Sequence, residues 1–121
     1  MSEQTYHVIK AYQTQYPDPL IVHAGDTLQI SKEEPWDDNP AWIWLWCTNP
    51  QGKSGWVPQS YLERGGNTGT MQVDYSTQEL TVAAGEIVTG AKEESGWAWC
   101  TTRQSKSGWV PLNCLARAEY P

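Results

Sequence analysis

Cysteine and histidine are two side-chain types in this sequence that could act as nucleophiles, bases or metal ligands. The 121 residues contain three Cys and two His, His7 and His23, without a Cys-x-x-Cys spacing. Cys47 and Cys100 precede similar segments, and we expect all three thiols to be reduced, buried, small apolar residues. No nucleophile has a neighbouring base, and no Gly-rich loop precedes a helix. The sequence therefore predicts no enzyme, no cofactor and no metal site, zinc included.

Tryptophan is the side chain type that stands out, with eight copies. In a strand successive side chains point to opposite faces, so Trp42, Trp44 and Trp46 share one face and the smaller residues between them share the inner face. Several large aromatic residues on an outer face indicate a ligand or partner surface. We expect Trp44 and Trp56 to contact a ligand, and Trp46 and Trp99 to be covered by loops or by the rest of the chain.

The charge of the chain limits its partners. The formal net charge is −6 at pH 7, and Lys and Arg form no stripe along the sequence. A chain of this sign repels phosphate and attracts basic peptides, which argues against nucleic acid. No charged-then-apolar leader and no apolar run near 18 residues is present, so we expect no membrane span and a cytoplasmic protein.

The elements that must position these residues occur twice. Lys53–Pro58 and Lys106–Pro111 are identical, Trp44 matches Trp97, and Tyr12 matches Tyr75. Such self-similarity indicates two copies of one small structural unit. Each copy is small enough to bury little surface alone, so we expect the two copies to pack together.

Short runs of alternating apolar and polar residues, separated by Gly, Pro, Asn and Asp, predict strands throughout and no helix. The expected strands of the first copy are residues 7–12, 27–31, 41–48, 53–58 and 62–64. Those of the second copy are residues 71–75, 87–91, 97–102, 106–111 and 115–117. The Gly-rich residues 65–69 are expected to be a short flexible linker between the copies.

Several sequence cues carry a family resemblance, in order and in both copies. In the second copy they are Met71-Gln-Val-Asp-Tyr75, Glu79-Leu-Thr-Val82, an Ala-Gly turn, a Trp strand and Gly-Trp-Val-Pro. Each copy resembles an SH3 domain, a five-stranded barrel that binds proline-rich peptides between aromatic ridges. The resemblance implies an all-β fold with two small SH3-like barrels in tandem: residues 5–64, the linker 65–69, and residues 70–118 with shortened loops.

The resemblance also implies a peptide groove in each copy, and an aromatic-lined groove suits a preformed polyproline II ligand. The first groove is expected to consist of Tyr12, Trp44, Trp56, Pro58 and Tyr61. Beside it we expect Asp18, Glu33 and Glu34, which would attract a basic ligand residue or simply be solvated, and Trp36 and Trp42, which flank the insertion 35–41. The second, degenerate groove would retain Tyr75, Trp97, Trp109 and Pro111, because Cys114 replaces its last Tyr.

The leading hypothesis is a non-catalytic protein–protein interaction module that binds proline-rich or basic peptides, mainly through barrel 1. The alternative is a structural or assembly module whose aromatic faces are buried between the two barrels or in a homodimer. A third hypothesis is an aromatic cage for a methylated or quaternary ammonium group. A fourth is a cell-wall peptide module, against which the missing export signal argues.

Overall fold

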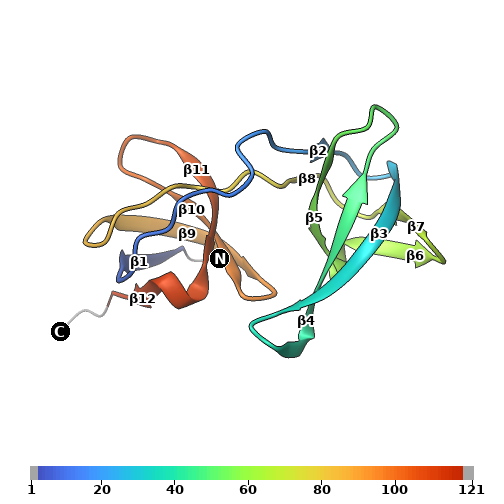
Figure 1. Ribbon diagram of the computed structural model, residues 1–121. Coiled ribbons are helices and arrows are strands. Elements are labelled where there is room, and N and C mark those ends of the chain that lie inside the picture. The colour runs from blue at the N-terminus through green and yellow to red at the C-terminus, as the bar shows by residue number, and fades with distance from the viewer. Residues whose placement is uncertain (1–2, 119–121) are drawn as a thin grey trace. The chain divides into compact units, whose positions relative to one another are not determined.

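A computed structural model describes residues 3–118. The chain is all-β apart from two short 3-10 helices, and it forms two compact units (Figure 1). Unit 1 comprises Met1–Pro17 and Gln78–Pro121, and unit 2 comprises Asp18–Thr77. The chain therefore leaves unit 1 after its first strand and returns to it after completing unit 2.

Unit 2 contains a five-stranded antiparallel sheet in the order β5-β4-β3-β7-β6. Its strands are β3 (Thr27–Trp36), β4 (Asn39–Thr48), β5 (Ser54–Pro58), β6 (Leu62–Gly65) and β7 (Thr68–Met71). The 3-10 helix η1 (Gln59–Tyr61) joins β5 to β6, and the short strands β2 (Ile21–Val22) and β8 (Tyr75–Ser76) pair with each other.

Unit 1 contains the equivalent sheet in the order β11-β10-β9-β1-β12. Its strands are β1 (Gln4–Val8), β9 (Ile87–Glu94), β10 (Trp97–Thr101), β11 (Ser107–Pro111) and β12 (Leu115–Arg117), with the 3-10 helix η2 (Leu112–Cys114) between the last two. The first strand begins and ends earlier than the expected range 7–12.

The two copies exchange their first strands. Strand β1, which opens the first copy, pairs with β9 and β12 of the second copy. Strand β7, which opens the second copy, pairs with β3 and β6 of the first. The compact units therefore differ from the expected consecutive division into 5–64 and 70–118.

A tight turn explains this exchange. Residues 65–69, expected as a linker, instead contain the end of β6, a turn at Gly66 and Asn67, and the start of β7. Gly66 has φ of 66°, and a two-residue loop with Gly and Asn is typical of a β-hairpin. Because β7 must lie next to β6, it fills the slot in the first copy's sheet, and β1 fills the equivalent slot in the other.

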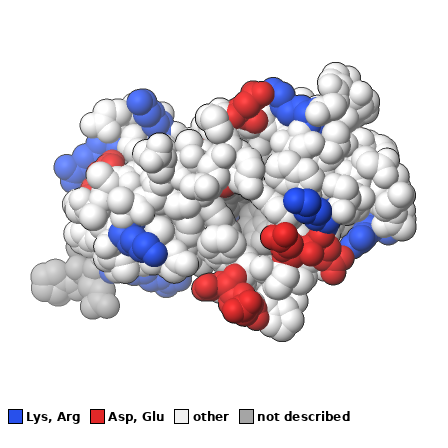
Figure 2. Space-filling view, in the orientation of Figure 1, with Lys and Arg blue, Asp and Glu red and all other residues white. Residues whose placement is uncertain are grey.

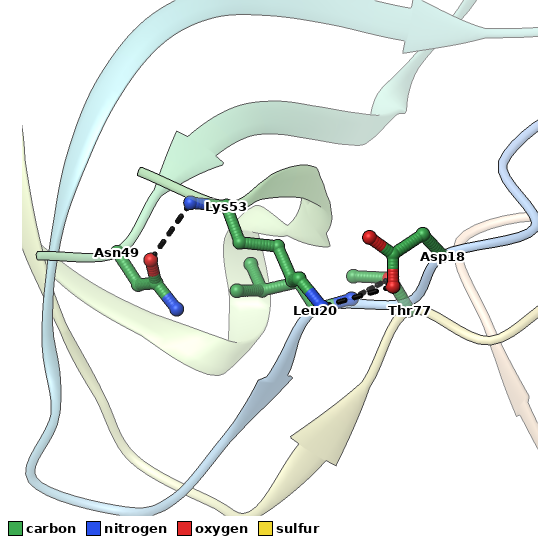
Figure 3. A network of polar contacts seen from close by, with 5 residues as sticks. All are labelled: Asp18, Leu20, Asn49, Lys53 and Thr77. Atoms are coloured by element: carbon green, nitrogen blue, oxygen red, sulfur yellow. Dashed lines mark hydrogen bonds and ion pairs between the residues drawn. The ribbon is translucent and has the colours of Figure 1, made fainter. Parts of the chain in front are cut away.

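The chain passes from unit 1 to unit 2 after Pro17 and returns after Thr77, and each of these two crossing segments is hydrogen-bonded within its unit. Tyr12 pairs with Val82 in unit 1, as Val22 of β2 pairs with Tyr75 of β8 in unit 2. Beside β2 and β8, the backbone N–H of Leu20 donates to Thr77 Oγ1 at 2.8 Å (Figure 3). If each copy folded on itself, one continuous loop would stand where these two paired segments now lie.

The inner faces of the sheets match the expected alternation. Six of the seven residues expected to point inward in β4, β5, β10 and β11 have no exposed surface: Leu45, Cys47, Val57, Ala98, Cys100 and Val110. The seventh, Ile43, lies on the lengthened part of β4 and is partly exposed. The outer faces are less open than expected, since Trp44 and Trp97 are each 8% exposed and Trp109 is 5% exposed. The main chain of Trp109 exchanges hydrogen bonds with Gln78 and Leu80 of the neighbouring segment.

The insertion 35–41 does not form a loop over a groove. Strand β3 continues to Trp36, β4 starts at Asn39, and only Asp37 and Asp38 form the turn, with φ of 57° and 56°. The insertion therefore lengthens the β3–β4 hairpin. In unit 1 the corresponding β9–β10 hairpin is shorter and turns at Ser95 and Gly96.

The described residues include neither a membrane-spanning helix nor a metal-binding cluster. Across residues 3–118 no helix is long and apolar enough to cross a membrane. Within the same residues no group of three or more His, Cys, Asp and Glu side chains could hold a metal ion. On the face shown in Figure 2, Lys and Arg are scattered and form no continuous basic stripe.

Candidate functional site

The aromatic residues of unit 2 form a connected set. The rings of Tyr61 and Tyr75 meet edge to face, with centroids 5.4 Å apart. The Tyr75 hydroxyl donates to the backbone carbonyl of Trp56 at 2.9 Å. Trp44 lies opposite Pro58 in the β4–β5 register, and Pro58 directly precedes η1, which contains Tyr61. Unit 2 thus brings together Trp44, Trp56, Pro58, Tyr61 and Tyr75.

A second aromatic pair lies on the same two strands. Trp46 and Trp56 are cross-strand neighbours, and their rings meet edge to face with centroids 5.1 Å apart. The Lys32 ammonium lies 6.0 Å from the Trp46 ring centroid, which is at the outer limit for a cation–π contact. Both Trp side chains are partly exposed, so Trp56 links the buried set to the surface.

Unit 1 contains a smaller version of this set. Tyr12 meets Trp97 edge to face with centroids 5.6 Å apart, and Trp97 lies opposite Pro111. Trp99 and Trp109 form the cross-strand pair at 5.4 Å. At the position of Tyr61 stands Cys114, so the second tyrosine ring is missing.

The structure divides the expected grooves differently at one position. Trp44, Trp56, Pro58 and Tyr61 come together as expected, but Tyr12 lies in the other unit. Tyr75, expected in the degenerate groove, takes its place, and Trp97, Trp109 and Pro111 are joined by Tyr12 instead. Both tyrosines follow an exchanged strand, so each one is carried into the unit that its strand enters.

The acidic residues expected beside the groove fall into two classes. Asp18 pairs with Lys53 at 2.9 Å (Figure 3), and Glu33 pairs with Arg64 at 2.6 Å. Glu34 is exposed and opposite Trp44 in the β3–β4 register, and no ion pair to it is present among residues 3–118. Trp36 and Trp42, both partly exposed, lie on the lengthened hairpin.

The ionisable groups inside the units are held neutral. Burial raises the pKa of Cys47 and of Cys100 to about 12, and the thiols are free and buried. Burial, together with a hydrogen bond to Glu79, raises the pKa of Tyr12 above its ordinary value. A thiol with such a raised pKa carries almost no thiolate at neutral pH and is a poor nucleophile.

Comparison with known protein families supplies one match. Residues 5–64 match the variant SH3 domain. SH3 domains are in general non-catalytic modules that mediate protein–protein interactions. The family model does not match a second SH3 domain in this chain, and no curated protein or solved structure matches it.

The matched SH3 range and unit 2 share most of their residues. The match includes Trp44, Trp56, Pro58 and Tyr61, together with β1, which the structure pairs with unit 1. Sequence reasoning missed Tyr75 as the partner of Tyr61. The two-residue turn at Gly66 and Asn67 between short strands is the signal that could have revealed it.

Proposed function

We propose that this protein is a non-catalytic interaction module in which each unit is an SH3-like barrel, and that unit 2 binds a proline-rich peptide. The observation that carries the proposal is the completeness of the unit 2 set: two tyrosines, two tryptophans and a proline in contact or in cross-strand register. Flat aromatic rings separated by a proline suit the rings of a polyproline II ligand.

The charge near this set supports a basic residue on the ligand. Glu34, Asp37 and Asp38 are exposed on the lengthened hairpin, and among the described residues they have no ion pair. Asp18 and Glu33 are already paired with Lys53 and Arg64, and therefore contribute less to attracting a ligand cation. We therefore propose a ligand with Arg or Lys beside its proline segment. The cytoplasmic location of the protein is a separate prediction.

The test compares the equivalent tryptophans of the two units. Tryptophan fluorescence is titrated with an array of proline-rich, Arg-flanked peptides, using the wild type, Trp44→Ala and Trp97→Ala. A saturable change that weakens at least ~10-fold in Trp44→Ala and persists in Trp97→Ala is expected, corresponding to about 1.4 kcal/mol. Equal affinity of wild type and Trp44→Ala would exclude unit 2 as the peptide site.

A second candidate function rests on the low exposure of the aromatic residues. Trp44 and Trp97 are 8% exposed and Trp109 is 5% exposed, so these rings offer little area to a ligand as they stand. In that case the protein is a structural or assembly module whose aromatic residues stabilise its own fold. Blue-shifted emission that no peptide changes, together with a loss of stability in Trp44→Ala, supports this function over peptide binding.

A further inference from the structure

In each unit, one residue on the exchanged strand faces one residue on the neighbouring strand, and one of the two is large while the other is glycine. In unit 1 the Tyr6 ring of β1 lies over Gly90 of β9, where an added Cβ would be only 2.4 Å from Tyr6 Cε2. In unit 2 the small residue is on the exchanged strand: an added Cβ at Gly69 of β7 would lie 3.2 Å from Cδ1 of Ile30 in β3 and 3.2 Å from Cδ2 of Leu62 in β6. Each pair therefore consists of one large side chain and one glycine.

These four residues occupy equivalent positions. Strand β1 places Tyr6 opposite Val88 and Arg117, and β7 places Gly69 opposite Leu28 and Arg64. Since the backbone registers are the same, main-chain hydrogen bonding gives neither strand a preference for either slot. The choice between the slots therefore falls to the side chains and to the connecting turn.

The side chains discriminate between the slots by volume. In a consecutive arrangement the Tyr6 ring would meet Ile30 where it now meets a glycine, and Gly69 would face Gly90. The first pairing overfills a closely packed interior, and the second leaves a void where the Tyr6 ring now lies. Tyr6 is 3% exposed and Ile30 is 5% exposed, so neither side chain can turn out into solvent without losing its burial.

Two further core positions also favour placing the Tyr6 ring in unit 1. Unit 1 has Ala98 and Cys114 where unit 2 has Leu45 and Tyr61, and Ala98, Cys114 and Tyr6 belong to one buried cluster. Unit 1 therefore has the smaller residues in the core that accommodates Tyr6.

The polar partners of Tyr6 do not make this choice. Its hydroxyl donates to Glu93, which also pairs with Arg117 at 3.4 Å. Unit 2 has the equivalent ion pair between Glu33 and Arg64 at 2.6 Å. A tyrosine in either slot would find a carboxylate, so the selection depends on size.

We infer that the pairs Tyr6 with Gly90 and Ile30 with Gly69 specify the exchange of β1 and β7, in concert with the Gly66–Asn67 turn. The consequence reaches the aromatic sets, because Tyr12 and Tyr75 follow the exchanged strands. The two size pairs thereby determine that Tyr75, and not Tyr12, joins Tyr61 in unit 2.

The full chain allows a balanced test with three variants. The first, Tyr6→Gly with Gly69→Tyr, reverses the sizes on the exchanged strands. The second, Ile30→Gly with Gly90→Ile, reverses them on β3 and β9. The third combines all four substitutions and restores one large and one small residue in each unit. All three variants have the same composition as the wild type.

Each double variant is expected to lower the folding equilibrium constant at least ~100-fold in urea unfolding. The quadruple variant is expected to be at least ~10-fold more stable than the two double variants combined predict, although Leu45 and Tyr61 leave less room for a tyrosine in unit 2. Recovery is the decisive signature, because independent substitutions would add. A quadruple variant as unstable as the two double variants combined would overturn the inference, as would double variants with wild-type stability and strand pairing.

A disulfide reporter records which slot β1 occupies in each variant. His7→Cys with Ala116→Cys joins residues that face each other in the exchanged arrangement, within bonding reach for an antiparallel pair. His7→Cys with Glu63→Cys is the matched control, since Glu63 is the equivalent of Ala116. The first pair alone should oxidise within one chain in the wild type and the quadruple variant. A shift to the control pair in a double variant supports the inference, and control oxidation in the wild type overturns it.

Discussion

Unit 1 and unit 2 have the same strand register, but their core residues at equivalent positions differ in size. Leu45 and Tyr61 of unit 2 correspond to Ala98 and Cys114 of unit 1, and Tyr6 supplies volume to the unit with the smaller residues. Two copies of one sequence have thus diverged into cores that accept different first strands. Sequence similarity between repeats therefore does not show that each repeat closes on itself.

The chain crossings differ between the units in a second way. In unit 1 the Glu79 carboxylate accepts hydrogen bonds from the Tyr12 hydroxyl at 2.7 Å, the Thr14 hydroxyl at 3.3 Å and the Gln15 backbone N–H at 3.0 Å. In unit 2 Pro19 stands at the position of Glu79, and the Tyr75 hydroxyl goes to a backbone carbonyl. The Glu79 carboxylate therefore bonds three residues of the crossing segment in unit 1, whereas in unit 2 the Asp74 carboxylate accepts one hydrogen bond, from the Ala24 backbone N–H.

The equivalent glycines of β5 and β11 should give the largest difference in stability. An added Cβ at Gly108 would lie 2.7 Å from the Glu79 carbonyl carbon, whereas at Gly55 the nearest atom is the Thr77 methyl, also at 2.7 Å. Main chain yields less readily than a side chain. Gly108→Ala is expected to cost about 3 kcal/mol of unfolding free energy and Gly55→Ala about 1 kcal/mol.

Urea unfolding of the two variants measures that difference. Gly65→Ala is the control, because an added Cβ there meets nothing within 4 Å, and it should change stability by less than about 0.5 kcal/mol. A larger loss of stability in Gly55→Ala than in Gly108→Ala would contradict the close packing of the Glu79 backbone against Gly108 of β11.

The equivalent tyrosines Tyr12 and Tyr75 should differ by a smaller amount. Tyr12→Phe removes a hydrogen bond to a carboxylate and is expected to cost about 1.5 kcal/mol, whereas Tyr75→Phe removes one to a carbonyl and should cost about 1 kcal/mol. Thermal unfolding of both variants provides the measurement. If Glu79→Gln in the Tyr12→Phe background costs as much as it does in the wild type, the Tyr12–Glu79 bond does not hold the crossing.

Two buried thiols at equivalent positions, one in each unit, should contribute alike to the response to pH. Cys47 and Cys100 both have a pKa raised to about 12 by burial, from an ordinary value of 9.0. A group with a raised folded pKa stabilises the fold below its unfolded pKa, and this stability is lost as pH rises. At pH 8 almost none of this stability is lost. The urea midpoint should fall as the pH rises from about 9 to about 12.

The variant Cys47→Ala with Cys100→Ala is the control for the pH response. Its urea midpoint should fall less steeply above pH 9 than that of the wild type. Cys114, Tyr6 and Tyr12, whose pKa values burial also raises, still contribute in this variant. An unchanged slope would mean that the two thiols ionise as readily in the folded protein as in the unfolded one.

Local patterning predicted much of the fold. The alternation in β4 and β10 correctly identified Leu45, Cys47, Ala98 and Cys100 as inward, because strand periodicity depends only on neighbouring residues. The expected strands 27–31 and 41–48 were too short, because most of the insertion 35–41 belongs to β3 and β4. Asp37 and Asp38 accept positive φ values, so the hairpin simply continues.

Strand pairing was harder to predict than strand position. Because β1 and β7 are equivalent, each satisfies the hydrogen bonds of either sheet, and a resemblance at the level of one copy does not distinguish the two arrangements. The candidate site was affected only at its tyrosines: Trp44, Trp56, Pro58 and Tyr61 are brought together as expected, and Tyr75 replaces Tyr12. The peptide-binding role of these residues stays a prediction.

The strand exchange is tested most directly by nuclear Overhauser effects in the unmodified chain. In the exchanged arrangement, the backbone protons of Gly69 lie near those of Leu28 and Arg64, and those of Tyr6 lie near those of Val88 and Arg117. Cross-strand effects between these pairs are expected. Effects from Gly69 to Val88 and from Tyr6 to Leu28 within a monomer would show that each copy closes on itself and would contradict the exchange.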